Sequence, residues 1–265
     1  MDFALSEDQV ELKQAAHAWL ADRFPLDRDW EAQNDRWSEL EELGWLDVAE
    51  AGLGFVEEAL LLEELGYVCY PGFYLAHVAG ITGDGDTATV DATRPLWPVE
   101  ETPRFRAAAA AEALGVAQRA LDLGVEHAKT RTQFGKPIGT YQAVSHPLAQ
   151  TYTDVELARS LVYWAAWCVA EEDEAGSAGG KAGARPEDPA AFSGGGRAPV
   201  AAASAKAFAT EAAVAACERS IQVHGGIGFT WEHPLHRFYK RAIWLEGYGA
   251  RPAELRLDVA EALLA

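Results

Sequence analysis

The chain has 265 residues, of which 49% are hydrophobic, and nine are tryptophans. This composition is typical of a folded globular protein with a sizeable core and excludes a disordered chain. The formal net charge of −19 argues against binding to nucleic acid or to anionic membranes, and would also repel coenzyme A unless basic residues gather at one site.

Helices are expected throughout residues 1–82, which we interpret as an N-terminal helical domain. Ser6 is followed three positions later by Gln9, a pattern that favours a helix start. The helix after it places apolar residues on one face. Further helices are predicted over residues 37–43 and 55–65, each ending before a glycine. The apolar residues 71–82 are compatible with another.

Residues 83–103 differ in character, because glycine, aspartate and proline recur there. We interpret them as a linker with at most one short strand, near residues 88–90.

The remaining residues, 104–265, are predicted to form a four-helix bundle. Helices are expected at about 105–131, 142–170, 199–223 and 234–264, the last one broken near residues 247–249. Residues 172–199 are of low complexity and are expected to form a flexible loop. The fold class is therefore all-α.

The cysteines Cys69, Cys168 and Cys217 are far apart and form no CxxC or Cys/His cluster. We expect neither a metal site nor a disulfide framework, and we assign all three to the core. The first residues lack the pattern of a signal peptide, and no uninterrupted apolar run approaches the length of a membrane span. We expect a cytoplasmic protein.

A first candidate binding segment is RTQFGKPIG, residues 131–139, directly after a helix. The planar guanidinium of Arg131 suits a pyrophosphate. Gly135 and Gly139 permit close approach of backbone to a ligand, and Phe134 suits an aromatic ring system. A helix-end salt bridge with Phe134 in the core is the open alternative.

A second candidate segment is QVHGGIGFT, residues 222–230. With Gln142 it adds amide and backbone donors around a turn of little bulk. The alternative is a plain helix-to-helix turn with glycine after the helix, which explains one of the three glycines well and the others less well.

Together, the stretches RTQFGKPI, QAVSHPLA and IQVHGGIGFTWEHPLHRFYKRA resemble the C-terminal domain of the acyl-CoA dehydrogenase family, which are flavin enzymes. The DFALSE start and the LEELG stretch at residues 62–66 are similar to the family's N-terminal domain. The resemblance covers roughly residues 1–82 and 104–250. It implies an FAD site shared across a subunit interface, with these positions facing the cofactor: Arg131, Gln133, Phe134, Ile138, Gln142, Gln222, Val223, Gly225 and Gly226.

Two departures from the family pattern stand out. The short linker replaces the family's middle β-domain, which covers one face of the flavin. The family's catalytic glutamate also lacks a counterpart, because its usual place falls on Gly249 and its alternative place on Phe105. Glu246 is our candidate substitute, and Glu112 is a second. The alternative for Glu246 is a solvated glutamate, or one paired with a nearby arginine.

Two further clusters have open interpretations. His224, His233 and His236 could join in a metal site, but no carboxylate or cysteine completes one at a usual spacing. The basic run Arg237, Lys240 and Arg241 either attracts a phosphate of CoA or FAD or balances Glu232 and Glu246.

The resemblance implies a subunit of a heteromeric FAD-dependent acyl-CoA dehydrogenase in lipid or steroid metabolism, which desaturates an acyl-CoA or acyl-carrier thioester. A full-length acyl-CoA dehydrogenase-like partner would supply the β-domain and the base, in a dimer or a dimer of dimers. Two alternatives stay open. One is a repurposed, flavin-free fold that binds or acts on a biosynthetic intermediate. The other is a scaffold for oligomerisation.

Overall fold

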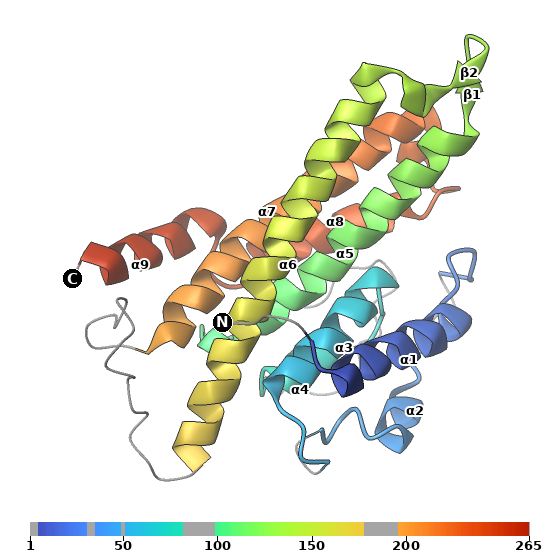
Figure 1. Ribbon diagram of the computed structural model, residues 1–265. Coiled ribbons are helices and arrows are strands. Elements are labelled where there is room, and N and C mark those ends of the chain that lie inside the picture. The colour runs from blue at the N-terminus through green and yellow to red at the C-terminus, as the bar shows by residue number, and fades with distance from the viewer. Residues whose placement is uncertain (1–4, 31–34, 49–50, 82–98, 178–195, 265) are drawn as a thin grey trace.

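The computed structural model describes residues 5–30, 35–48, 51–81, 99–177 and 196–264. Within these ranges the helices form an N-terminal group and a longer C-terminal bundle, and the strands are confined to one short hairpin at the end of the bundle (Figure 1). The N-terminal group comprises α1 (Glu7–Arg23), α2 (Trp37–Glu42), α3 (Phe55–Tyr67) and α4 (Tyr74–Val78). The C-terminal group comprises α5 (Pro103–Thr130), β1 (Thr132–Gln133), β2 (Lys136–Pro137), the 3-10 helix η1 (Ile138–Thr140), α6 (Gln142–Ser177), α7 (Arg197–His224), the 3-10 helix η2 (Gly225–Phe229), α8 (Leu235–Gly247) and α9 (Pro252–Leu264).

The predicted all-α class is confirmed, and local hydrogen bonds explain where the helices begin. Ser6 Oγ accepts from the Gln9 N–H at 3.2 Å, and the Gln9 side chain accepts from the Ser6 N–H at 3.0 Å, so α1 starts with the predicted cap. Thr102 caps α5 in the same way, with its hydroxyl 3.1 Å from the Phe105 nitrogen.

The helices α6 and α7 extend further than expected, into the range assigned to a loop. The helix α6 continues to Ser177, and α7 already begins at Arg197. The Ala198 N–H donates to the Glu172 carboxylate at 3.1 Å, which ties the start of α7 to the end of α6. Residues 178–195, like the strand expected near residues 88–90, lie outside the described residues.

Small residues let the bundle helices approach closely. The five alanines Ala107–Ala111 of α5 are all buried, and α7 packs against α5, α6, α8 and α9 with a face that is mostly alanine. The three cysteines lie in the core, as predicted. By length and composition the segment Arg197–Phe229 could cross a membrane, but 72% of its apolar window is buried in the protein. It is thus the central helix of the bundle.

The two helix groups meet where α3 crosses α5. A Cβ atom on Gly66 would lie 2.1 Å from the Glu112 carbonyl oxygen, and one on Gly115 would lie 1.8 Å from the Glu63 carbonyl oxygen. Each distance is far below van der Waals contact, so only glycine permits this backbone-to-backbone approach.

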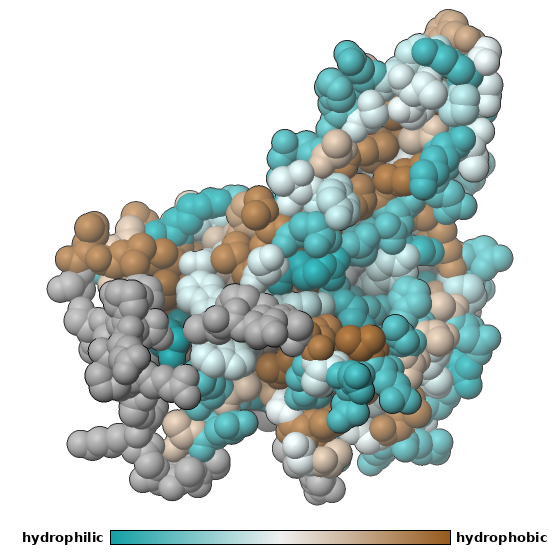
Figure 2. Space-filling view, viewed as in Figure 1, coloured by the Kyte–Doolittle hydropathy of each residue, from teal (hydrophilic) through white to brown (hydrophobic). Residues whose placement is uncertain are grey.

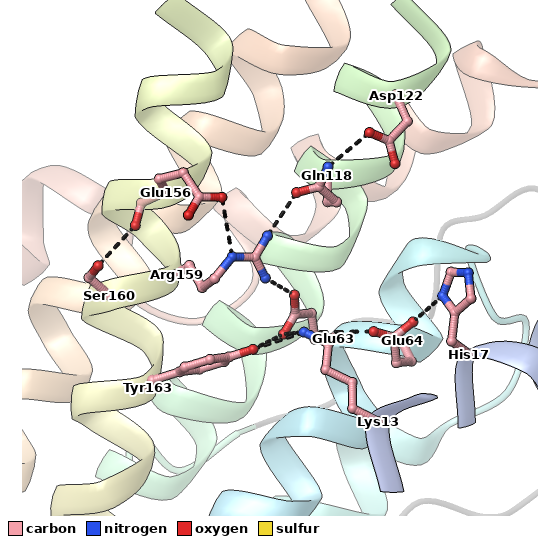
Figure 3. Close-up of polar contacts among 10 residues, drawn as sticks. All are labelled: Lys13, His17, Glu63, Glu64, Gln118, Asp122, Glu156, Arg159, Ser160 and Tyr163. Carbon is pink, nitrogen blue, oxygen red and sulfur yellow. Dashed lines mark hydrogen bonds and ion pairs between the residues drawn. The ribbon is translucent and has the colours of Figure 1, made fainter. Parts of the chain in front are cut away.

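A buried polar network adds directional contacts to this crossing (Figure 3). Glu63 of α3 accepts from Lys13 of α1 at 2.6 Å and from the Tyr163 hydroxyl of α6 at 2.7 Å, and it also pairs with Arg159. Arg159 in turn donates to Gln118 of α5 at 2.7 Å. Burial alone would raise the pKa of Glu63, but the charges of Lys13 and Arg159 outweigh burial and lower it. The ionised Glu63 carboxylate thus joins α1, α3 and α6, and Arg159 extends the network to α5.

Candidate functional site at the end of the bundle

The first candidate segment forms a tight hairpin where α5 ends. Thr132 pairs with Pro137 and Gln133 with Lys136 in antiparallel register. Phe134 and Gly135 make the turn, and both have positive φ, of 52° and 81°. Two positive φ angles are what a two-residue hairpin turn requires. The turn leaves Phe134 93% exposed, so the alternative that placed Phe134 in the core is wrong.

The hairpin is held against the end of α5 by backbone contacts. The Ile138 N–H donates to the Arg131 carbonyl at 2.9 Å, and Ile138 packs partly buried against the core. Gly139 lies so close to α5 that a Cβ there would be 3.0 Å from the Ala128 carbonyl oxygen. The orientation of Arg131 and Phe134 at the surface therefore follows from the fold of residues 131–140.

The second candidate segment lies at the same end of the bundle. Gln222 and Val223 occupy the last turn of α7, and Gly225 ends that helix with a φ of 66°. The ring of His224 stacks on that of His127, near the end of α5, at a centroid distance of 4.3 Å. This contact joins the ends of α5 and α7, and so brings the two segments into one region (Figure 1).

The histidine cluster at this point differs from the one expected. His233 lies 4.4 Å from His224 between ring centroids, whereas His236 packs instead against Trp231 at 4.6 Å. Burial, followed by the charges of the other histidines, lowers the pKa of His233 to about 4. The described residues contain no group of three or more metal-type ligands that could hold an ion. The stacked rings are neutral at pH 7 and serve to pack the helix ends.

The residues assigned to the cofactor share one property, which is access to solvent. Ile138 and Val223 are partly buried, and the others are exposed: Arg131, Gln133, Phe134, Gln142, Gln222, Gly225 and Gly226. A guanidinium, three side-chain amides, an exposed aromatic ring and a glycine turn fit a phosphate and one side of a planar ligand. Because these residues form an open surface, they could contact one side of a dinucleotide but could not enclose it.

Gly249 and Phe105, the two positions expected from the resemblance to correspond to the family's base, lie close together, and Gly249 also lies beside Glu101. A Cβ on Gly249 would lie 1.8 Å from Glu101 Oε1 and 2.9 Å from the ring of Phe105. Glu101 Oε1 accepts from the Ala250 N–H at 2.6 Å, and Oε2 accepts from Arg106 Nε at 2.9 Å. Sequence reasoning missed Glu101 because it lies in the range assigned to the linker. Both of its oxygens are engaged, so the Glu101 carboxylate is held in place by the chain.

The two candidate substitute bases, Glu112 and Glu246, differ in burial and in ion pairing. Glu112 is 1% exposed and pairs with Arg241, whose guanidinium is fully buried, at 2.5 Å. Glu246, in the last turn of α8, is partly buried and forms no ion pair with any described residue. Burial, followed by the charges of Glu211 and Glu218, raises its pKa. The ion-pair alternative is therefore wrong, whereas a catalytic base and a solvated glutamate both remain open for Glu246.

The basic run does not act as one group. Arg241 is committed to Glu112 rather than to the glutamates expected to balance it. Arg237 is 5% exposed, and its guanidinium lies over the ring of Trp30 at 5.2 Å. Lys240 lies over the ring of Trp231 at 4.5 Å. All three cations therefore make contacts within the chain.

Comparisons with known proteins bear on this arrangement. The acyl-CoA dehydrogenase N-terminal domain matches residues 6–84, and the acyl-CoA dehydrogenase C-terminal domain matches residues 99–264. Fourteen residues, 85–98, thus lie between the two matches. No middle β-domain is present between them.

Two curated relatives align with part of the chain. Acyl-CoA dehydrogenase IpdE2 of Mycobacterium tuberculosis (strain ATCC 25618 / H37Rv) is 39% identical over 153 residues, 57% of this chain and 39% of that protein. Probable acyl-CoA dehydrogenase YngJ of Bacillus subtilis (strain 168) is 37% identical over 160 residues, 60% of this chain and 36% of that protein. The chain thus spans well under half the length of these relatives.

Two solved structures have the same fold. A variant of the Tcur3481-Tcur3483 steroid ACAD matches with a TM-score of 0.73 and 21% identity, covering 97% of this chain and 98% of that one. The ChsE4-ChsE5 complex from Mycobacterium tuberculosis matches with a TM-score of 0.74 and 19% identity, covering 100% and 99%. At these identities the similarity shows the fold alone.

Proposed function

Because the chain belongs to the acyl-CoA dehydrogenase family, we propose that it is a subunit of a heteromeric, FAD-dependent acyl-CoA dehydrogenase in the cytoplasm. Its bundle end completes an FAD site whose β-domain comes from a full-length partner subunit. The complex desaturates an acyl thioester of lipid or steroid type, on CoA or on an acyl carrier. The assembly is a dimer or a dimer of dimers.

The observation that carries the proposal is the exposure of the binding residues. Phe134 is 93% exposed and Phe229 75% exposed, although aromatic rings of this size are usually buried. Exposed aromatic and arginine side chains gathered in one region are typical of protein and ligand contacts. A partner that covers this end would enclose the ligand between two chains. The two solved structures support this reading, since Tcur3481-Tcur3483 and ChsE4-ChsE5 are both pairs of chains.

Each residue has a role that follows from its chemistry and place. Arg131 would hold the pyrophosphate through two parallel N–H donors. Gln222 and the backbone at Gly225 and Gly226 would add neutral donors to the phosphate and ribose. Phe134 would lie against the ring edge and exclude water. When bound, FAD supplies the acceptor for the hydride of the substrate; this chain positions it.

The proton acceptor is assigned to the partner. A side chain at Gly249, where the resemblance puts the family's base, would meet the Glu101 carboxylate, whose oxygens are engaged by Ala250 and Arg106. Glu246 is the chain's own candidate. An activity that survives Glu246→Gln in the complex supports the assignment to the partner.

The test is to co-express the chain with a full-length homologue and to compare two variants. Arg131→Gln removes the fork that grips the pyrophosphate, and Lys129→Gln removes the same charge from an exposed position two residues earlier. Loss of one charge-assisted contact costs about 1.5–3 kcal/mol, or roughly ten- to a hundred-fold in flavin affinity. We expect this loss for Arg131→Gln alone.

If both variants keep wild-type flavin affinity in a stable complex, the bundle end does not touch the cofactor. If the chain forms no flavin-containing complex with any homologue, the result would favour the alternative of a flavin-free fold that binds or acts on a biosynthetic intermediate.

A further inference from the structure

A cavity lies away from the bundle end, between the N-terminal helices and the bundle. Its volume is about 250 Å³, and its walls come from the end of α1, the chain that follows it, α3, α5 and α8. Small-molecule sites typically span ~300–1,000 Å³, so this cavity suits a short ligand.

One wall of the cavity is cationic in a chain of net charge −19. Arg119 of α5 donates to the Tyr67 hydroxyl at 3.0 Å, and its guanidinium lies 4.8 Å from the Tyr67 ring centre. Arg28 follows α1 and lines the same cavity. Neither guanidinium forms an ion pair with a carboxylate of the described residues, and the lining includes no acidic residue.

Arg28 is fixed by the backbone around it. Its two terminal nitrogens donate to the carbonyls of Phe24, Pro25, Val68 and Cys69, at 3.0, 3.2, 2.8 and 3.1 Å, so all four of their N–H groups are engaged. Its Nε is buried and has no hydrogen-bond partner. Burial, followed by the charges of nearby arginines, lowers the pKa of Arg28 to about 10. An unneutralised positive charge therefore persists at this wall, and an anion would offset it.

Two carboxylates near the cavity, those of Asp122 and Glu64, already accept hydrogen bonds. Asp122 accepts from the Tyr67 hydroxyl at 2.9 Å and from Gln118 at 2.9 Å. Glu64 accepts from His17, which lines the cavity, at 2.7 Å. Neither of these two carboxylates is therefore available to Arg119.

The rest of the cavity lining is largely apolar. Phe24, Leu26, Val68 and Phe238 line it. Phe238 is fully buried and Phe24 is 4% exposed, so these rings are fixed by the core. A ligand with a charged head and a short hydrocarbon body matches both walls, whereas an inorganic anion would leave the apolar wall unused.

We propose that this cavity binds a short aliphatic carboxylate, with its oxygens on Arg119, the Arg28 charge nearby, and its hydrocarbon body against Phe24, Leu26, Val68 and Phe238. The site is separate from the flavin surface, and the proposal does not depend on it. A planar guanidinium pairs with a carboxylate through two parallel hydrogen bonds, which gives the site its preference for this head group.

The test is a ligand-observed NMR titration of the full chain with carboxyl-labelled butyrate, butyramide and inorganic phosphate. Butyramide has nearly the shape of butyrate but no charge. We expect saturable binding of butyrate, with butyramide and phosphate each about ten-fold weaker or more. Phosphate binding without butyrate binding, or equal affinity for butyrate and butyramide, would overturn the proposal.

Two substitutions on α5 form a matched pair. Arg119→Gln is expected to weaken butyrate binding by about ten-fold or more, since it removes the two-pronged contact. Lys129→Gln removes the same charge from an exposed site on the same helix and should change affinity by less than about two-fold. Equal effects of the two would mean that butyrate responds only to net charge. Arg119→Lys tests the same contact should Arg119→Gln fail to fold, and it too should weaken binding because it lacks the fork.

Discussion

The buried ion pair between Glu112 of α5 and Arg241 of α8 should be among the most sensitive points of the fold. Its atoms are 2.5 Å apart, and the two side chains are 2% and 0% exposed. Glu112→Ala leaves the Arg241 charge buried without its carboxylate, which costs about 3–5 kcal/mol. Domain stabilities are about 5–15 kcal/mol, so this loss is a large fraction of the total.

The double variant Glu112→Leu/Arg241→Met should be less damaged than the single variant. It removes both charges, and apolar replacements of buried pairs are often neutral or stabilising. However, Arg241 also donates to the Tyr70 carbonyl at 3.1 Å, and losing that donor costs about 1–3 kcal/mol. We therefore expect a net loss of about 1–3 kcal/mol, below that of Glu112→Ala.

The assay is urea unfolding monitored by circular dichroism. The free energy of unfolding is compared between variants for which its dependence on urea concentration has the same slope. A loss under about 1 kcal/mol for Glu112→Ala would refute the assignment of a desolvated pair. A double variant that is less stable than the single one would refute the argument that the stranded charge, rather than lost packing, causes the damage.

Three further predictions concern stability. Gly115→Ala should destabilise by about 2 kcal/mol or more because its Cβ would meet the Glu63 carbonyl at 1.8 Å, whereas Gly247→Ala, with nothing within 4 Å, should be neutral or gain up to about 1 kcal/mol in urea melts. The pKa of His233 falls from 6.5 to about 4 on folding, so its contribution to stability is complete above pH 6.5 and is lost as the pH falls toward 4. His233→Gln should therefore reduce the loss of melting temperature between pH 7 and pH 5, and an unchanged pH profile would contradict this. Glu101→Ala should lower the free energy of unfolding by about 1–3 kcal/mol, because the Ala250 N–H and Arg106 lose their acceptor. An unchanged free energy in thermal or urea unfolding would show that the turn at residues 247–250 is stable without Glu101.

Local sequence patterns were enough to predict the helices, because caps and apolar periodicity act within a few residues. The Ser6 cap and the break between α8 and α9 were found in this way and are confirmed. The ends of α6 and α7 were misjudged, since a contact between Glu172 and Ala198 spans 26 positions and leaves no local signal.

The sequence predicted which residues belong to the candidate site, but it did not predict how they are arranged at the surface. The sequence placed Arg131 and Gln222 in one site by resemblance, and the stacked rings of His127 and His224 bring their segments to one end. The residues alone left Phe134 either facing a ligand or in the core, because the choice depends on a hairpin turn whose φ angles the sequence does not display. Glu101 was missed for a related reason: its contact with the chain at Ala250 spans 149 positions.

The proposed division of the FAD site between two chains is tested most directly by the flavin content of purified protein. The absorption spectrum is recorded for the chain expressed alone and for the complex co-purified with a full-length homologue, and flavin is quantified per chain. We expect no flavin on the chain alone, because its binding residues form an open surface, and a flavin spectrum in the complex. Stoichiometric flavin on the isolated chain would contradict the account.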